Sequence, residues 1–358
     1  MNIFFLTETE SGCYRWRSAI PAKYLRRRGH TVQILSDNFQ AYEAPDVIVI
    51  FRAHYPDVHR LVEWCKQRDI RVVFDTDDAL DRVPKENIHY RELQGRLGLY
   101  SFLLEHADVV TTTTPVLAAD LRQRNPNVVV LPNSADPEEW NVRPRGDDLR
   151  IGWTGSATHF HDLAVALPAI REVQKHHPFT LVLQGLCDRP DLVEFYSGLV
   201  ASHGKPFVNS PLGKSIRRLV EELVSIRYEF HPMVPFSQHA EKVCELALNI
   251  GIAPLVEDSF NRNKSCIKYY EYALSGAVTV ASRVLPYSTE VSITCKNNRQ
   301  SWKDTLESLI DADRDTLWHQ QRDWVLANRN IEQNVELWEQ VYRGELTSSL
   351  GVADQNAA

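Results

Sequence analysis

The sequence predicts an α/β protein of two doubly wound domains, each built on a parallel sheet, followed by a helical tail. Three observations lead to this prediction. Short apolar runs alternate with longer amphipathic segments, which is typical of repeated strand, helix and strand units. A polar segment interrupts this alternation near the middle of the chain. The last segment with helical spacing, residues 301–343, is followed by no further strand pattern.

The first predicted domain covers residues 1–135 and is Rossmann-like. Its strand-length apolar runs are separated mostly by segments long enough for a helix. One such segment, residues 15–28, ends at Gly29, a suitable C-cap. The predicted strands of this domain are residues 2–6, 31–35, 46–51, 70–75, 108–112 and 128–131.

A linker is predicted where residues 133–149 break the pattern with three charged clusters, two Pro and one Gly. We place it at residues 136–149. The second domain, residues 150–320, then resumes the alternation, although residues 190–226 are mostly helical and polar. Its predicted strands are residues 150–154, 179–184, 227–231, 249–255 and 277–281.

The end of the chain is predicted to leave the second sheet. Residues 321–345 form C-terminal helices that can pack back on the N-terminal domain. Residues 346–358 are small and polar, which predicts a disordered tail.

Composition limits the possible functions. The 358 residues carry a formal net charge of -7, which gives no general attraction to nucleic acid or to an anionic membrane. A bound anion therefore needs a local site. Six Cys without a CxxC pair argue against zinc and disulfide frameworks and favour reduced thiols. The first residues are too quickly polar for a signal peptide, and no apolar run approaches a membrane span of roughly 20 residues. We expect a cytoplasmic protein.

Loops that follow strands are where an open parallel sheet binds ligands. Four such loops are rich in polar or small residues, and all four can converge if the domains face each other across a cleft. They are Thr7–Tyr14, Asp75–Asp81, Thr154–His161 and Glu257–Lys264.

The last of these loops indicates an anion site. A helix beginning near Lys264 or Ser265 directs its free N–H groups and positive dipole end into the cleft, beside Arg262. Glu271 lies about 10 Å further along the axis, where it can accept hydrogen bonds from a sugar diol. The alternative is a solvated helix in which Lys268 and Glu271 pair across one turn. The residue types leave both interpretations open.

The segment from Leu255 to Ser282 resembles the nucleotide-sugar motif of GT-B glycosyltransferases, in particular the large retaining family 4. It contains Asn-Arg-x-Lys-Ser, then Glu-Tyr-Ala-Leu-Ser-Gly and Val-Thr-Val-Ala-Ser. The resemblance runs over residues 1–343, and the order of the motifs carries it. The other matching segments are Gly12, Gly29-His30-Thr31-Val32, Thr111 to Pro115, Leu131-Pro132-Asn133 and Ile151-Gly152-Trp153-Thr154-Gly155-Ser156.

The resemblance implies that the C-terminal domain binds a nucleotide-diphosphate sugar. We expect no other cofactor and no bound metal, because the sequence offers no convincing set of hard oxygen ligands outside residues 75–78. The sugar then passes to an acceptor on the N-terminal domain, which is a glycan, a lipid-linked acceptor or another hydroxyl compound. In family 4, two Glu separated by seven residues contact the donor, the first at the sugar and the second at the ribose. Glu271 matches the second, whereas the first falls on Asn263, a departure at the position that handles the sugar. The residues assigned to nucleotide-sugar binding are Gly12, Arg15, Gly155, Ser156, Arg262, Lys264, Ser265, Lys268 and Glu271.

The catalytic assignments are Asp77, Asp78 and Asn263. The Asp-x-Asp pattern ending at Asp77 resembles the metal site of GT-A transferases, but the two-domain layout is wrong for that fold. The other interpretations are carboxylates that orient or deprotonate an acceptor hydroxyl, and a turn cluster that opens the next helix.

Several basic residues near strand ends have two interpretations. Arg15 and Arg17 beside Gly12 can reach a phosphate, or they belong to the solvated face of a helix. His54 and His89 follow strands and are candidates for the cleft, although a lone His is more often structural. Two other functions also remain open, a nucleotide-sugar epimerase and a catalytically inactive sugar-nucleotide-binding subunit.

Overall fold

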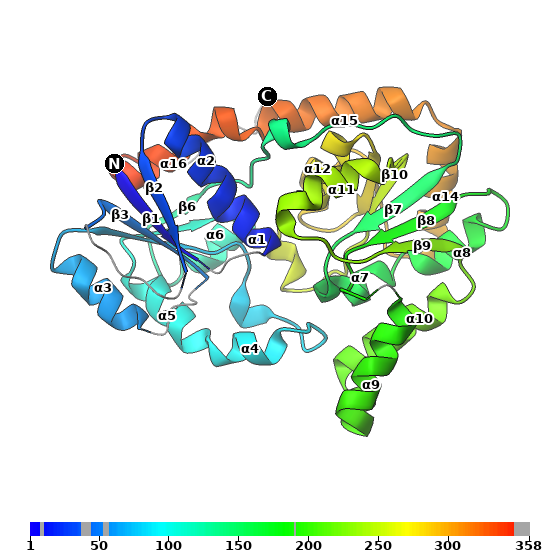
Figure 1. The fold of residues 1–358 in the computed structure, drawn as a ribbon, viewed down its shortest axis with the longest axis horizontal. Coiled ribbons are helices and arrows are strands. Elements are labelled where there is room, and N and C mark those ends of the chain that lie inside the picture. Colours follow the sequence, from blue (N-terminus) through cyan, green and yellow to red (C-terminus); the bar gives the residue numbers. More distant parts are fainter. Residues whose placement is uncertain (8–10, 37–43, 53–56, 190, 347–358) are drawn as a thin grey trace.

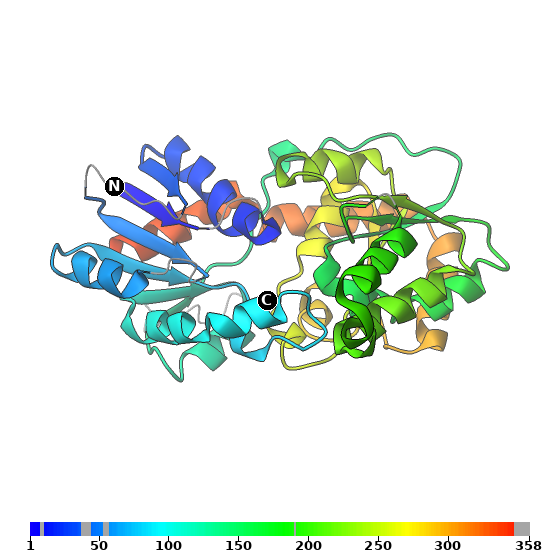
Figure 2. The same cartoon turned by 60° about the horizontal axis from the view of Figure 1, so that its bottom comes forward.

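The computed structural model describes residues 1–7, 11–36, 44–52, 57–189 and 191–346. These residues form two six-stranded sheets whose paired strands are parallel. Helices cover the sheets, and the two domains lie side by side (Figures 1 and 2). The predicted fold class is therefore confirmed. His54 and nearly all of the predicted disordered tail lie outside the described residues.

The first sheet has the strand order β2-β1-β3-β4-β5-β6. Successive side chains point to opposite faces, so Ile3 and Phe5 join one core while Phe4 and Leu6 join another. Both faces are covered, which is why β3 is buried along its whole length. The strands are β1 Asn2–Leu6, β2 Thr31–Leu35, β3 Val47–Phe51, β4 Arg71–Asp75, β5 Val109–Thr112 and β6 Val128–Val130.

The second sheet has the order β12-β11-β10-β7-β8-β9. All of its predicted strands are present, and β12 is an addition that the sequence did not reveal because two residues are too few to show alternation. The strands are β7 Arg150–Thr154, β8 Thr180–Gln184, β9 Tyr228–His231, β10 Ile250–Ala253, β11 Val278–Ser282 and β12 Thr294–Cys295.

Helices of the N-terminal domain pack on both faces of its sheet. The helix predicted over residues 15–28 begins earlier, at Gly12, and its residues Arg15–Ala19 form a π-helical turn between α1 and α2. Pro21 at the start of α2 has no N–H for a helical bond to the carbonyl four residues back, which a wider turn accommodates. The helices are α1 Gly12–Tyr14, α2 Ile20–Arg27, α3 Val58–Lys66, α4 Tyr90–Gly95, α5 Leu97–His106 and α6 Pro115–Leu121.

Helices of the C-terminal half include α9 and α10 in the long crossover between β8 and β9, which agrees with the mostly helical prediction over the described residues 191–226. In Figure 1 part of this crossover, α9, projects away from the sheet. The helices are α7 Phe160–Leu163, α8 Leu167–Val173, α9 Leu192–Asn209, α10 Pro211–Leu223, α11 His239–Glu245, α12 Ile267–Ser275, α13 Tyr287–Glu290, α14 Arg299–Asp311, α15 Arg314–Asn328 and α16 Ile331–Arg343.

The last two helices connect the domains along one side of the molecule (Figure 1). α15 packs on α12 and β11, whereas α16 packs on α2 of the N-terminal domain. A charged pair fixes the second contact, with Arg28 Nη2 donating to Glu339 Oε2 at 2.7 Å. The segment between the sheets is anchored at the same place, where the N–H of Ala135 donates to the carbonyl of Arg329 at 2.7 Å. Helical packing thus holds the two sheets in one arrangement.

Candidate functional site

Side chains from the two domains meet where the carboxyl ends of the two sheets face each other. Lys264 Nζ, in the loop after β10, lies 3.2 Å from Asp78 Oδ1, in the loop after β4. The Thr114 hydroxyl donates to the carbonyl of Asn263 at 3.0 Å. We call the residues in these contacts the interdomain junction. The junction brings together residues assigned from sequence to the donor and to the acceptor.

Asp77 and Asp78 are held by a single arginine. Arg52 Nε donates to Asp77 Oδ1 at 2.7 Å, and Arg52 Nη2 donates to Asp78 Oδ2 at 2.9 Å. Burial alone would raise the pKa of Asp77, but Arg52 lowers it below its usual value. Asp77 is therefore a carboxylate near neutral pH, matched by a cation of its own domain.

Arg52 itself adopts a left-handed backbone conformation, with φ of 59°. Such a conformation is uncommon for a residue with a side chain and is often found at functional sites. Arg52 also contacts Cys13, whose Sγ lies 2.9 Å from Nη2. Burial raises the pKa of the Cys13 thiol well above its usual value, so this thiol is neutral.

Glu271 lies in the middle of α12 and is only 6% exposed. Its Oε1 is 3.1 Å from His239 Nε2 and 4.0 Å from Arg15 Nη1. Burial would raise the pKa of Glu271, but His239, Arg15 and Lys268 lower it, so the side chain is ionised. The alternative of a solvated helix is wrong, because Glu271 is buried and its hydrogen bond goes to another helix.

Arg15 comes from the first domain and forms an ion pair with Glu139. Its side chain is 8% exposed. Of its two terminal nitrogens, Nη1 is buried and has no hydrogen-bond partner among the described residues. Such an unpaired buried donor is costly, which makes it a good candidate for contact with an anionic ligand.

Lys268 lies in the first turn of α12, with Nζ 5.3 Å from the centroid of the Trp153 ring. Burial lowers the pKa of Lys268 to about 8. In the part of the chain that the structure describes, its ammonium forms no hydrogen bond or ion pair. A Cβ at Gly155 would lie 2.7 Å from Trp153 and 3.1 Å from this ammonium. A glycine is therefore needed at position 155 to leave room beside Lys268.

The start of α12 requires a correction. The helix was predicted to begin near Lys264 or Ser265, but it begins at Ile267. Residues Asn261–Asn263 form a 3₁₀ turn, Lys264 is extended, and the Ser265 hydroxyl accepts from Asn133 Nδ2 at 2.7 Å. The N–H groups of Tyr269 and Tyr270 donate to the carbonyl of Cys266, which leaves those of Ile267 and Lys268 at the start of the helix.

Asn263 is fully buried at this turn. Its Nδ2 donates to the carbonyl of Ser259 at 2.7 Å. Its Oδ1 has no hydrogen-bond partner among the described residues. The amide is thus fixed through its nitrogen, and its oxygen is left as an acceptor.

Three other assigned residues have different surroundings. Arg262 is exposed. Ser156 Oγ bonds to Thr158 Oγ1 within its own loop at 2.8 Å. Gly12 faces Phe236, where a Cβ would lie 3.2 Å from the ring.

Arg17 and His89 do not reach the donor residues. Arg17 is fully buried and donates to both oxygens of Asp75, at 2.9 and 2.6 Å. It therefore belongs to neither the predicted phosphate site nor a solvated face. His89 is exposed and lies 3.4 Å from Glu92.

Sequence reasoning missed two residues that hold the site, Arg52 and His239. Arg52 immediately follows β3, and the rule that selected Asp77 from a strand-end loop also applies to it. His239 opens α11, and no local pattern connects it with Glu271, which is 32 positions away.

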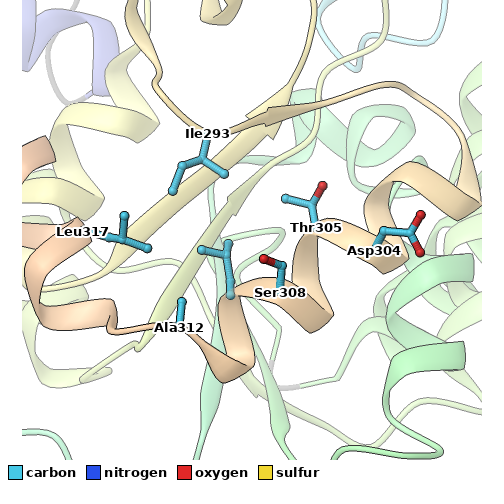
Figure 3. A pocket seen from close by; sticks show the side chains of 7 residues that line it. Ile293, Asp304, Thr305, Ser308, Ala312 and Leu317 are labelled. Atoms are coloured by element: carbon cyan, nitrogen blue, oxygen red, sulfur yellow. The ribbon is translucent and has the colours of Figure 1, made fainter.

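One hollow lies outside the junction. It has a volume of about 350 Å³ and lies between β12, α14 and α15, as Figure 3 shows. Leu309 and Leu317 are among the residues that line it, and Figure 3 shows Asp304 at its edge. It contains none of the residues assigned to the donor or the acceptor.

Two further observations concern the described residues only. No group of three or more His, Cys, Asp or Glu side chains is placed to hold a metal ion. None of the described helices is both long and apolar enough to cross a membrane.

Comparisons with known proteins are informative only at the level of structure. No protein-family model and no curated protein matches the sequence. An alpha-glucosyltransferase solved with UDP-glucose and DNA is similar, with a TM-score of 0.64, 12% identity, and coverage of 95% of this chain and 98% of that one. A glycosyltransferase from Rickettsia africae has a TM-score of 0.64 at 11% identity, with 99% of each chain covered. OtsA has a TM-score of 0.61 at 10% identity, with coverage of 96% and 99%.

These identities are too low to show a shared activity. The TM-scores and the coverage establish the fold. The family 4 resemblance stays a prediction. The chain has the two-domain GT-B fold that these glycosyltransferase structures share.

Proposed function

We propose that this protein transfers a sugar from a nucleotide-diphosphate sugar to a hydroxyl group of an acceptor, with retention of configuration and without a bound metal ion. The observation that carries the proposal is that α12 contains both a buried carboxylate, Glu271, and the ammonium of Lys268, which has no partner among the described residues. A nucleoside diphosphate needs both groups, one for its ribose and one for its phosphates.

The donor is proposed to bind at α12. Its diphosphate contacts the free N–H groups of the first turn and Lys268, where the helix dipole also favours negative charge. Arg15 adds from the opposite domain its Nη1, which forms no hydrogen bond with the described residues and lies 4.0 Å from Glu271 Oε1. Glu271 lies about 6 Å along the helix axis from Ile267 and accepts hydrogen bonds from the ribose diol.

Donor binding requires the junction to change. Lys264 pairs with Asp78 across the domains, so it cannot contact a diphosphate at the same time without moving. We propose that the phosphates replace Asp78 as the partner of Lys264. This exchange leaves Asp78 with Arg52 alone and makes it available to orient an acceptor hydroxyl.

The donor sugar is proposed to lie near Asn263. Family 4 has a carboxylate at this position, whereas here the free Oδ1 of an amide accepts one hydrogen bond from the sugar. As the leaving group departs, Lys268, Lys264 and the α12 N-terminus stabilise the growing negative charge of the diphosphate. Retention follows from the family 4 resemblance.

Turnover tests the proposal. The chain is incubated with UDP-sugars first, since similar structures were solved with UDP or UDP-glucose, and then with other nucleotide sugars. We expect the donor to be consumed for transfer only when a hydroxyl acceptor is present. Isomerisation of the donor alone would identify an epimerase. Binding without either reaction would identify the inactive subunit suggested by Asn263, and would contradict the proposal.

A further inference from the structure

His159 and Asp162 form a fixed pair at the end of β7. His159 Nδ1 lies 2.8 Å from Asp162 Oδ2. Asp162 is 1% exposed, and its other oxygen accepts from the N–H of Val256 at 2.8 Å and from Asn261 Nδ2 at 3.2 Å. The carboxylate therefore ties the loop after β7 to the loop after β10, and it holds the imidazole in one orientation.

This pair fixes which nitrogen of the ring carries the proton. The nearby His159 lowers the pKa of Asp162 although burial opposes it, so Asp162 is a carboxylate and can only accept. Nδ1 must then be the donor. The second nitrogen of His159, Nε2, forms no hydrogen bond within the described part of the chain, and the side chain is 17% exposed. Nε2 is thus available to a ligand.

This imidazole and Lys268 both lie near the indole ring of Trp153. The His159 ring meets the Trp153 ring edge-on with centroids 6.4 Å apart, and Lys268 Nζ is 5.3 Å from the centroid of the same indole. Gly155 lies between Trp153 and His159 in sequence, and a Cβ there would lie 2.7 Å from Trp153 and 3.1 Å from Lys268 Nζ. Burial, and then the positive charges of Lys268 and Lys264, lower the pKa of His159, which places both ammonium groups near the imidazole.

We infer that His159 is a further donor-binding residue, whose Nε2 contacts a phosphate oxygen of the nucleotide sugar while Asp162 holds Nδ1. The inference rests on the proposed function, because it takes the diphosphate to lie at the α12 N-terminus. It assigns a histidine to a contact that sequence reasoning gave to Arg262 and Lys264.

Donor binding should then be coupled to proton uptake. The charged groups that act on His159 are Asp162 from α7, Lys268 from α12 and Lys264 from the preceding loop, and His161 lies 3.6 Å from the other oxygen of Asp162. Burial, followed by Lys268, lowers the pKa of His159 to about 3 in the free protein, so Nε2 carries no proton. A bound diphosphate places negative charge beside the ring and therefore favours the protonated imidazole. The imidazole must gain a proton to donate to a phosphate oxygen.

The test is calorimetric titration with UDP at pH 6 and fixed salt, in two buffers of different ionisation enthalpy. His159→Asn keeps a donor to Asp162 in place of Nδ1 and removes Nε2. We expect its UDP affinity to fall about ten-fold. We also expect it to take up about one proton fewer than the wild type. The difference between the two proteins cancels any proton that UDP itself releases. Uridine, which has no phosphate, should bind both equally, which also shows that the variant is folded.

The matched control is His161→Asn, because His161 Nε2 lies 3.6 Å from the other oxygen of Asp162. It should bind UDP with wild-type affinity and proton uptake. Equal losses in both variants would overturn the inference, since the effect would then come from Asp162. Wild-type UDP affinity and proton uptake in His159→Asn would overturn this inference but not the proposed function. A wild-type protein that binds neither UDP nor any other nucleoside diphosphate would overturn the proposed function as well.

Discussion

Glu271 illustrates how a single buried charge points to a ligand. An ionised carboxylate is expensive to bury unless hydrogen bonds and opposite charges compensate it. Here His239 supplies one hydrogen bond at 3.1 Å and Arg15 remains 4.0 Å away. A carboxylate can accept about four hydrogen bonds, so Glu271 has capacity left for a ribose diol.

Lys268 predicts how nucleotide affinity depends on pH. Its pKa of about 8 means that the ammonium loses its charge above pH 8 in the free protein. A bound diphosphate favours the charged form, so UDP affinity should fall about ten-fold between pH 7 and pH 9. Lys268→Met should bind more weakly at pH 7 and lack this fall. Titrations of both proteins with UDP at constant salt measure how the affinity changes with pH. The same change in both proteins would contradict the role of Lys268.

Asp78→Asn should separate the acceptor from the donor. The substitution removes the charge that pairs with Lys264 and Arg52. Transfer to the acceptor should slow by about a hundred-fold or more. UDP affinity should be unchanged or higher, because Lys264 is released. Initial rates and UDP titration of the folded variant give both quantities. A collapse of UDP binding would show that Asp78 serves the donor.

At the residue scale, the sequence predicted which side chains belong to the candidate donor site better than it predicted which residues contact them. Glu271 and Lys268 were found because helical spacing puts them near one another. Arg52 and His239 were missed because their partners lie 25 and 32 positions away, and a single sequence does not reveal which strand ends become neighbours.

Among the elements, α12 carries the donor residues, and its position depends on close packing against β10. A Cβ at Gly251 would lie 2.3 Å from the Tyr272 ring. The Tyr272 hydroxyl in turn accepts from the N–H of Thr154 at 2.8 Å. Gly251 thus allows α12 to lie close enough to β10 to link it to β7.

Gly251→Ala should therefore destabilise the fold by about 1–3 kcal/mol through overpacking. Gly198→Ala is the matched control, because this glycine lies within α9 and a Cβ there has nothing within 4 Å. It should stabilise the protein by up to about 1 kcal/mol. Urea unfolding of both variants measures the difference. Equal stabilities would contradict the close-packing argument.

The elements also show what sequence patterns can and cannot predict. Buried parallel strands such as Val47–Phe51 are continuous apolar runs bounded by polar residues, so they were found within a residue or two of their ends. The start of α12 was predicted too early. Lys264 and Ser265 are held by Asp78 and Asn133 of the other domain, contacts that local helix signals do not contain.

On the scale of the whole molecule, the charges at the junction predict activity without a divalent cation. Arg52 and Lys264 already pair with Asp77 and Asp78. The leaving diphosphate has Lys264, Lys268 and the N-terminus of α12 to neutralise it. Transfer should therefore continue at an unchanged rate in excess EDTA. Activity that EDTA abolishes and Mn²⁺ restores would contradict this prediction.

The two-domain architecture was predictable because repeated strand and helix units leave a period in the sequence. The interdomain junction could not be predicted, because it depends on how the two domains face each other, and the sequence pattern of each domain is independent of the other. Lys264 and Asp78 are 186 positions apart and meet only in the folded chain.

The most direct test of the central claim is the affinity of Glu271→Gln for a nucleoside diphosphate. A charged hydrogen bond to the ribose diol is worth about 1.5–3 kcal/mol, so UDP affinity should fall about ten-fold to a hundred-fold. Glu241→Gln, on the exposed surface of α11, is the control and should bind like the wild type. Calorimetric titration at fixed salt gives the values. Wild-type UDP affinity in folded Glu271→Gln would show that α12 does not bind the nucleotide.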